Sequence, residues 1–349
     1  MAFLITSILV LPYLIFASAQ QLSIAGNGPP VRADGKYEIC AGGIRAYFIP
    51  YGASLSNLFI QDIHGVERDI VLGFDNATYY SESALHPHLN GIPGRYANRI
   101  SNGTFTIDSE THHTDLNENG EDTLHGGSDG WDWRNWTVIA HTTDSVTFSL
   151  VDPADSMGFP GEVTAFVIYT VTPYSWNVRM NALATTRKTP IMLTSHTYLN
   201  LDGFQNPHTP LALEHTLYMP HAGQRISTDG TLIPDGDVLP NVKDGTFDFW
   251  SKPKQLGANI TAPLGLNITY SAAHGACGTG CTGYDTCFTL NRNAQRRLNS
   301  QNKQSVATLA SPWSGIRLDI FTNQEAMQVY TCNNMNGTSL VTSSRIVWY

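Results

Sequence analysis

The stretch VTAFVIYTV, at residues 163–171, is dominated by β-branched and aromatic residues, which favour a β-strand. Short runs of the same kind recur, most with some alternation of apolar and polar residues, at residues 44–49, 104–107, 146–151 and 316–321. Turn residues separate these runs, and turns are expected at residues 50–52, 153–155 and 234–236. We find no amphipathic helix of three turns or more. The sequence therefore predicts an all-β protein, folded as a sandwich or a barrel.

The composition limits the domain organisation and the partners. The 349 residues could form one or two β domains, and the lack of a composition break after Gln20 favours one continuous domain, 20–349. Charged residues are only 14% of the chain, against about 25% in ordinary soluble domains. The net charge of −9 argues against nucleic acid or an anionic membrane as a partner, because both attract positive charge.

The amino terminus has the pattern of a secretory signal peptide. Residues 3–16 are almost wholly apolar, and Ala17-Ser18-Ala19 is a small-residue cleavage site before Gln20. An uncleaved membrane anchor is the alternative, but about 20 apolar residues are normally needed to span a bilayer and this stretch is shorter. We therefore expect residues 1–19 to be a signal peptide and the mature protein to be secreted and extracellular.

Sequons for N-glycosylation support the same compartment. Attached glycans would supply the surface hydration that the low charge does not. The sequons lie at Asn76, Asn102, Asn135, Asn259, Asn267 and Asn336.

The chain has five cysteines, and an oxidising compartment makes disulfides the expected state. Cys277 and Cys281 would close a natural short loop around glycine residues. A zinc site including His274 is the alternative, and the three-residue gap, the glycines and the secreted context favour the disulfide. The odd count leaves either a free thiol or a partner outside this chain.

Polar residues concentrate in three loops, at residues 91–101, 117–136 and 194–203. The first contains GRYANRI at 94–100, where paired arginines and an asparagine could hold several hydroxyl groups, since a guanidinium offers five donors. Taken alone, the same residues favour a solvated edge strand.

The second loop contains LHGG at 124–127, followed by Trp131, Trp133 and Trp136. The glycines would allow the backbone to approach a ligand closely, and tryptophan faces suit the apolar face of a sugar ring. The alternative is that at least two of the tryptophans belong to the core. The third loop contains TSHTYLNL at 194–201, in which His196 is either structural or a general acid or base.

Together, in this order, these motifs resemble the aldose 1-epimerase (galactose mutarotase) family. Its signature reads Gly-Arg-x-Ala-Asn-Arg-Ile, then Leu-His-Gly-Gly, then Ser-His-Ser-Tyr-Phe-Asn-Leu. Further stretches match it upstream and downstream, at residues 51–53, 71–75, 283–285 and 327–333. The resemblance, which runs from about residue 37 to 340, implies a large antiparallel β-sandwich with an open sugar-binding cleft.

The resemblance also implies the chemistry, which is interconversion of the α and β anomers of a free aldose. A base removes the C1 hydroxyl proton while an acid protonates the ring oxygen, and the steps reverse after rotation about C1–C2. No metal or redox cofactor is needed. The catalytic residues implied are His196 as the acid and His125 as a group that stabilises the ring oxygen. The residues implied to bind the monosaccharide, an aldohexose, are Asn98, Arg99, Tyr198, Asp285 and Gln328.

The sequence departs from the family at its end. The family base is a glutamate that follows the position of Gln328, and here no Asp or Glu follows Gln328. We therefore expect the domain to lack its final strands, with an incomplete gene model as the favoured explanation. The alternative is a catalytically weak or inactive secreted sugar-binding protein. A hexose 6-phosphate epimerase is a third reading, but it needs a basic phosphate clamp, which the acidic balance argues against.

Overall fold

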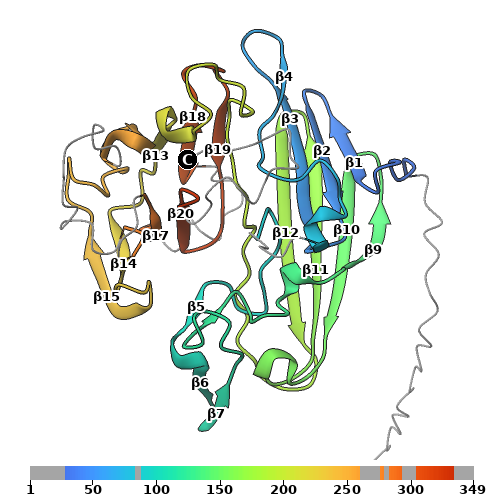
Figure 1. The fold of residues 1–349 in the computed structure, drawn as a ribbon, viewed down its shortest axis with the longest axis vertical. Helices are drawn as coiled ribbons and strands as arrows, with labels where there is room; N and C mark the ends of the chain where they lie inside the picture. Colours follow the sequence, from blue (N-terminus) through green and yellow to red (C-terminus); the bar gives the residue numbers. More distant parts are fainter. Residues whose placement is uncertain (1–27, 83–87, 260–275, 279–282, 293–303, 334–349) are drawn as a thin grey trace, which may run out of the picture.

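Antiparallel strands form four four-stranded sheets and two small two-stranded sheets in the part of the chain that the computed structural model describes (Figure 1). The described residues are 28–82, 88–259, 276–278, 283–292 and 304–333. The all-β prediction is confirmed.

Two of the four-stranded sheets come from the first half of the chain. The first has the order β1-β2-β3-β4 and contains β1 (Tyr37–Ala41), β2 (Ile44–Ile49), β3 (Ser54–Gln61) and β4 (Glu67–Asp69). The second has the order β12-β11-β10-β9 and contains β9 (Thr137–His141), β10 (Ser145–Asp152), β11 (Val163–Thr172) and β12 (Ser175–Ala184). Figure 1 shows these two sheets together on one side of the molecule.

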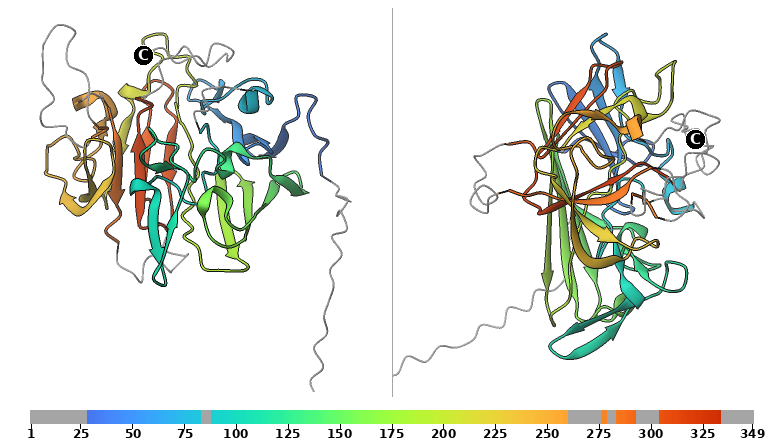
Figure 2. Two further views of the ribbon diagram at one scale, coloured as in Figure 1. Left: turned by 60° about the horizontal axis from the view of Figure 1, so that its bottom comes forward. Right: turned by 90° about the vertical axis from the view of Figure 1, so that its left-hand side faces the viewer.

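The other two four-stranded sheets come from the second half and lie beside the first pair (Figures 1 and 2). One has the order β16-β13-β18-β19 and contains β13 (Thr216–Tyr218), β16 (Lys254–Gln255), β18 (Ala307–Ala310) and β19 (Arg317–Ile320). The other has the order β15-β14-β17-β20 and contains β14 (Gln224–Thr228), β15 (Pro234–Pro240), β17 (Asp285–Thr289) and β20 (Ala326–Tyr330).

Short elements connect the sheets. The two-stranded sheets pair β5 (Arg99–Ile100) with β8 (Thr123–Leu124), and β6 (Thr104–Ile107) with β7 (Glu110–His113). The helical turns in the described residues are α1 (Tyr79–Glu82), η1 (Ser101–Gly103), η2 (Trp131–Trp133), η3 (Ser156–Gly158), η4 (Ala212–Glu214) and η5 (Leu256–Asn259). None of the described helices is long and apolar enough to cross a bilayer.

Strand β11 shows why these sequences form strands. Its side chains alternate between buried and partly buried over nearly its whole length, so one face meets the core and the other faces outward. The five strand regions expected from composition all contain strands. The expected turn at residues 234–236 is wrong, because these residues begin β15. Pro234 occupies the first position of that strand, where proline's missing N–H is tolerated.

The first two sheets pack face to face through aromatic side chains. Phe48 of β2 stacks on Tyr169 of β11 with ring centroids 4.4 Å apart, and the Tyr169 hydroxyl donates a hydrogen bond to the Ala53 carbonyl at 2.9 Å. Both rings are fully buried. The same hydrophobic cluster extends into the second half of the chain through Phe249 and Phe288, so the two halves share one core.

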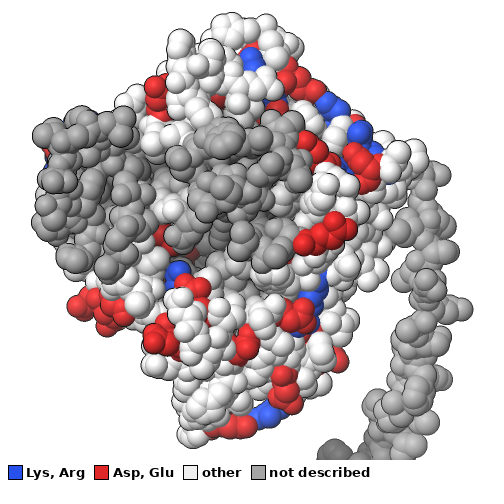
Figure 3. All heavy atoms as spheres, viewed as in Figure 1, with Lys and Arg blue, Asp and Glu red and all other residues white. Residues whose placement is uncertain are grey.

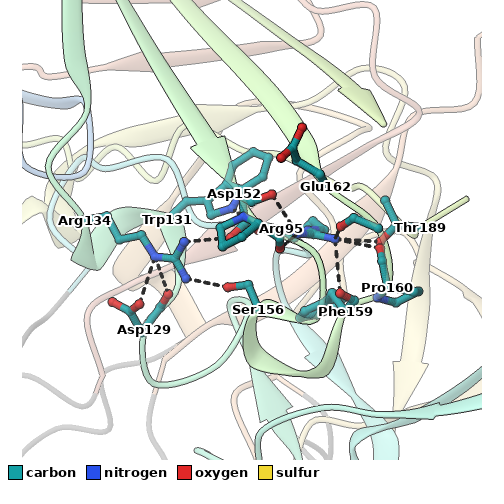
Figure 4. A network of polar contacts seen from close by, with 12 residues as sticks. Arg95, Asp129, Trp131, Arg134, Asp152, Ser156, Phe159, Pro160, Glu162 and Thr189 are labelled. Atoms are coloured by element: carbon teal, nitrogen blue, oxygen red, sulfur yellow. Dashed lines mark hydrogen bonds and ion pairs between the residues drawn. The ribbon is translucent and has the colours of Figure 1, made fainter. Parts of the chain in front are cut away.

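Arg95, in the GRYANRI motif, is a buried residue whose donors are taken up by a carboxylate and backbone carbonyls. It is only 1% exposed, and its guanidinium forms two hydrogen bonds to Asp152 Oδ2, at 2.9 and 2.7 Å (Figure 4). It also donates to the carbonyl oxygens of Pro160 and Gly161, at 2.9 and 2.7 Å. The interpretation of both motif arginines as hydroxyl-binding groups, or as a solvated edge, is therefore wrong for Arg95.

Asp152 joins this arginine to the tryptophan loop. The Trp131 indole N–H donates to Asp152 Oδ2 at 2.9 Å, and Arg134 Nη1 donates to Oδ1 at 2.7 Å (Figure 4). Burial by itself would raise the pKa of Asp152. The Trp131 hydrogen bond and the Arg95 charge outweigh burial and hold the pKa below its usual value. Asp152 is therefore ionised and forms ion pairs with two side chains, Arg95 and Arg134.

The tryptophan loop divides between core and site. Trp131 and Trp136 are 1% and 2% exposed, and the Trp136 indole donates to the Trp131 carbonyl at 2.9 Å. The expectation that at least two of the three tryptophans are core residues is confirmed. Trp133 is partly exposed and lies near the site described below.

Removal of the buried charge pair should be costly. We expect Asp152→Asn to lower the free energy of unfolding by about 3–5 kcal/mol, because it leaves the buried Arg95 charge without its counter-ion. Urea denaturation followed by tryptophan fluorescence measures this change. Asp108→Asn is the matched control. It breaks an ion pair between Asp108 and Lys188, whose side chains are 68% and 74% exposed respectively, and should leave the urea midpoint unchanged. Equal midpoints for the two variants would contradict the proposed role of Asp152.

Candidate active site

Asn98 and His125 form two hydrogen bonds with each other beside the small β5–β8 sheet. The Asn98 backbone N–H donates to His125 Nδ1 at 3.0 Å, and the backbone N–H of His125 donates to the Asn98 carbonyl at 3.1 Å. A backbone N–H can only donate, so Nδ1 of His125 is unprotonated and its proton is on Nε2. The His125 ring is thereby fixed as a hydrogen-bond donor toward any ligand.

Gly126, which follows His125, is required by the packing of the backbone. A Cβ placed on Gly126 would lie 1.9 Å from the Gly94 carbonyl oxygen, and the φ angle of Gly126 is +90°. Only glycine fits there. The expected close approach of backbone to a ligand is instead an approach of backbone to backbone, which brings the LHGG and GRYANRI motifs together.

His196 lies next to His125. The two ring centroids are 5.1 Å apart, with the ring planes at 88°. The His196 segment is tied to the segment just before GRYANRI: His196 N–H donates to the Gly91 carbonyl, and Asn90 N–H donates to the His196 carbonyl, both at 3.0 Å. The buried Asn90 side chain accepts from Tyr198 N–H at 2.8 Å and strengthens this pairing.

A third histidine, His88, completes the group, and we call His88, His125 and His196 the histidine cluster. The His88 ring centroid is 4.7 Å from that of His125 and 6.0 Å from that of His196. His88 Nδ1 is hydrogen-bonded to the buried carboxylate of Asp132, and the His88 side chain is 18% exposed. Sequence reasoning missed both His88 and Asp132. Asp132 is 44 residues away along the chain, so no local pattern connects the pair.

The pKa values of the two predicted catalytic histidines are both lowered. Burial lowers the pKa of His125 well below its usual value, and the electrostatic effects of His88, His196 and Arg99 on a protonated His125 ring lower it further. The pKa of His196 is lowered to about 4. Burial is the largest cause, the electrostatic effect of His88 adds to it, and the charge of Asp132 opposes it. Both rings are therefore neutral at neutral pH.

Tyr198 lies beside His196. Its ring centroid is 5.0 Å from that of His196, and it is only 7% exposed. Burial raises the pKa of Tyr198, and the neighbouring Cys332 and Tyr330 add to this shift. Tyr198 is therefore a neutral phenol beside the cluster.

Asp285 and Gln328 come from paired strands of the second half and reach the same region. Gln328 Nε2 donates to Asp285 Oδ1 at 2.6 Å, and Asn98 Nδ2 lies 3.5 Å from Gln328 Oε1. Burial raises the pKa of Asp285, with the Gln328 hydrogen bond and the Arg99 charge acting against it. These contacts link the two halves of the chain through polar side chains.

An ion pair with a carboxylate restricts the rotation of the Arg99 side chain. Its Nη2 forms an ion pair with Glu118 Oε1 at 3.0 Å, and its side chain is 10% exposed. Its Nε is buried with no hydrogen-bond partner among the described residues. The structure thus brings together all seven residues predicted for catalysis and substrate binding, and it adds His88, Asp132 and Glu118.

Other predicted sites are only partly within the described residues. Cys277 is disulfide-bonded, but Cys281 lies outside the described residues, so their pairing stays a prediction. Among the sequons, Asn76, Asn102 and Asn135 are exposed, whereas the side chain of Asn259 and all of Asn267 and Asn336 lie outside what is described. No group of three His, Cys, Asp or Glu side chains in the described residues has a geometry that could hold a metal ion.

Comparison with known proteins gives one consistent family. The family model described as aldose 1-epimerase matches residues 35–345. A probable aldose 1-epimerase of Arthroderma benhamiae is 40% identical over 329 residues, covering 89% of this chain and 71% of that protein. The galactose mutarotase of Sus scrofa is 32% identical over 306 residues, covering 87% and 79%. The crystal structure of a GalM/aldose epimerase homologue from C. elegans has a TM-score of 0.70 at 29% identity, covering 85% of this chain and 81% of that chain.

The lowered pKa of His196 predicts a pH effect on stability. Between its usual value of 6.5 and its folded value of about 4, the unfolded chain binds a proton at His196 that the folded chain does not. The contribution is therefore complete above pH 6.5 and is lost as the pH falls through about 4. We expect His196→Gln to flatten the fall of unfolding free energy over this window, measured by urea denaturation at several pH values.

The exposed His208 provides the control for this measurement. His208→Gln should retain the wild-type slope. Carboxylates such as Asp152 also lose their contribution in acid, so only the difference between the two variants reports on His196. The same slope in both would show that His196 is not held neutral by the fold.

Proposed function

The chain belongs to the aldose 1-epimerase family, and we propose that it interconverts the α and β anomers of free hexoses such as glucose and galactose. The names of its relatives support this reaction class, and the geometry of the site supports acid/base ring opening as the mechanism. In this proposal the histidine cluster exchanges protons with the sugar, and the polar side chains beside it hold the hydroxyl groups.

The observation that carries the proposal is the juxtaposition of His125 and His196, with ring centroids 5.1 Å apart, beside a chain of amide and carboxylate groups. Ring opening needs proton transfer at two oxygens of one sugar at nearly the same place, which two adjacent imidazoles can serve. His125 presents a fixed donor for the ring oxygen, since its Nδ1 is occupied.

The binding half of the site suits a neutral molecule with many hydroxyl groups. Asn98, Gln328 and Asp285 form a continuous series of donors and acceptors along one side of the cluster. Such convergent polar groups fix the orientation of a sugar. Arg99 supplies donors in the same region, but its charge is balanced by Glu118, so it does not provide an unopposed phosphate site.

The surface agrees with a neutral substrate. On the face in Figure 3, acidic side chains are spread widely and the fewer basic ones lie among them. A hexose 6-phosphate would require concentrated positive charge to compensate its dianionic group. A free aldose requires none.

A sugar-binding protein with weak catalysis is the second candidate, and one observation favours it. The carboxylates of Asp132, Asp285 and Glu118 each already bind another side chain of the site: His88, Gln328 and Arg99 respectively. If a carboxylate must act as the base at C1, each of these three would first have to give up its present partner. This candidate predicts saturable binding of glucose or galactose by calorimetry without faster mutarotation.

Acceleration of mutarotation by the wild-type protein decides between the candidates, and a substitution of His196 tests the proposed proton-transfer group. We expect the purified protein to accelerate the change in optical rotation of fresh α-galactose or α-glucose. We expect His196→Asn to lower kcat by about 10²–10⁴-fold, because it removes a proton-transfer group. His208→Asn, at an exposed position, is the matched control and should keep wild-type activity. Sugar binding with no acceleration in the wild type would favour the second candidate, and full activity in His196→Asn would exclude His196 from proton transfer.

We also propose that the protein is secreted and glycosylated. The apolar segment with its Ala-Ser-Ala site supports export, and the exposure of Asn76, Asn102 and Asn135 makes these sequons accessible to glycosylation. Expression in a eukaryotic secretory host should yield protein in the medium with Gln20 at its amino terminus. Peptide N-glycosidase should then lower its apparent mass. Retention in the cell with Met1 intact would refute the proposal.

A further inference from the structure

Glu118 is an acidic residue of the site that none of the sequence motifs contains. Its Oε1 accepts a hydrogen bond from Arg99 Nη2 at 3.0 Å, and the two side chains are 26% and 10% exposed respectively. Arg99 directly follows Asn98, whose amide lies 3.5 Å from that of Gln328. Gln328 in turn donates to Asp285. The ion pair therefore adjoins the side chains that are proposed to bind the sugar.

The loop that carries Glu118 is attached to the strand that pairs with Arg99. Leu124 of β8 lies directly opposite Arg99 of β5. The Asn117 side chain accepts from the Leu124 N–H at 2.8 Å and donates to the Leu124 carbonyl at 3.0 Å. Glu118 and Asp122 exchange two backbone hydrogen bonds, at 3.0 and 3.2 Å. The backbone thus places the Glu118 carboxylate against the guanidinium, and the ion pair does not have to hold it there alone.

The Glu118 carboxylate opposes a charge that little else near Arg99 can offset. A guanidinium stays protonated at any physiological pH. The Arg99 side chain is nine-tenths buried, and its Nε has no hydrogen-bond partner among the described residues. A buried cation extends a strong field into its surroundings unless a carboxylate lies against it. Contact with Glu118 at 3.0 Å therefore cancels most of the field that Arg99 would direct into the site.

The effect of this pair extends to Asp285. Burial is the largest cause of the raised pKa of Asp285. The Gln328 hydrogen bond and the Arg99 charge oppose the shift, and the Glu118 charge adds to it. Both members of the pair therefore act on the same carboxylate, with opposite signs. Two carboxylates accompany one guanidinium here, so the group is net negative when both are ionised.

A net-negative group beside the sugar would distinguish two kinds of aldose. A uronate carries an ionised carboxylate where a hexose has its C6 hydroxymethyl group, and both have the same C1 hydroxyl and ring oxygen. The ring-opening chemistry is therefore equally available to both. Selectivity commonly depends on a repulsive element as well as on attractive contacts, and a like charge in a partly buried site provides one.

We propose that Glu118 is a specificity-determining residue, which neutralises Arg99 so that the site accepts neutral aldoses and rejects their uronate counterparts. This rests on the proposed mutarotase function and names the substrate class within it. Without the Glu118 charge, Arg99 would attract a sugar carboxylate, since a guanidinium binds carboxylates through parallel N–H donors. With Glu118 in place, that donor group is occupied and the charge beside it repels the anion.

The test compares kcat/KM for galactose and galacturonate at neutral pH, by polarimetry with the spontaneous rate subtracted. Glu118→Gln keeps an acceptor oxygen for Arg99 Nη2 and removes only the charge. We expect it to raise the ratio of galacturonate to galactose kcat/KM by about tenfold or more, chiefly through KM. Glu118→Ala removes the same charge and replaces Glu118→Gln if that variant does not fold.

Two controls separate this role from a structural one. Glu121→Gln makes the same charge change three residues along the same loop, at an exposed position, and should keep the wild-type ratio. Adding Arg99→Gln to Glu118→Gln should abolish the gain for galacturonate, because the gain depends on the unopposed guanidinium. A loss of structure at Glu118 would instead lower kcat/KM for both sugars alike and leave their ratio unchanged.

The outcomes distinguish this inference from the proposed function. A wild type that turns over both sugars equally overturns the inference, as does a ratio that Glu118→Gln leaves unchanged or that Glu121→Gln shifts as much. Each of these leaves the mutarotase function intact, because galactose is still converted. A wild type that accelerates neither sugar overturns the proposed function. Calorimetry then tests the inference on binding alone, and equal selectivity in wild type and Glu118→Gln would overturn it.

Discussion

The ion pair between Arg95 and Asp152 is the constraint on which the site depends. A guanidinium that is 1% exposed needs a counter-ion and acceptors for its remaining donors, and Asp152 with the carbonyls of Pro160 and Gly161 supplies them. The same carboxylate binds the Trp131 indole. One buried group therefore fixes the start of GRYANRI, the tryptophan loop and the end of β10. The site residues Asn98 and His88–Asp132 depend on these segments for their positions.

The site is assembled from backbone conformations that most residues avoid. His88, Asn90, Asn98 and His125 all have positive φ angles, between 53° and 65°. Each such residue costs free energy and persists only where surrounding contacts determine its conformation. Here the reciprocal hydrogen bonds between Asn98 and His125, and the hydrogen bond from the Asn90 N–H to the His196 carbonyl, provide those contacts. The concentration of this conformation around the imidazoles agrees with a site whose geometry is set before any ligand arrives.

Much of the fold and part of the site could be predicted from the sequence, and the limits have physical causes. Strands such as β11 were predictable because alternation and β-branched residues act within one element. The turn expected at Pro234 failed because proline is also compatible with the first residue of a strand. Arg95 was misjudged because its partner lies 57 residues away, and His88 was missed because Asp132 is 44 residues away. A local pattern cannot report which distant side chain will meet a buried charge.

The order of the site residues along the chain has a consequence for biosynthesis. The Arg95–Asp152 pair and the histidine cluster come from residues 88–196, whereas Asp285 and Gln328 belong to β17 and β20. On the ribosome the chain emerges from its amino terminus, so the two sheets of the first half can pack and the imidazoles can be positioned while the second half is still being translated. Asp285 and Gln328, which are proposed to bind the sugar, arrive last. A nascent chain can thus have the histidine cluster in place before the side chains proposed to hold a sugar have been made.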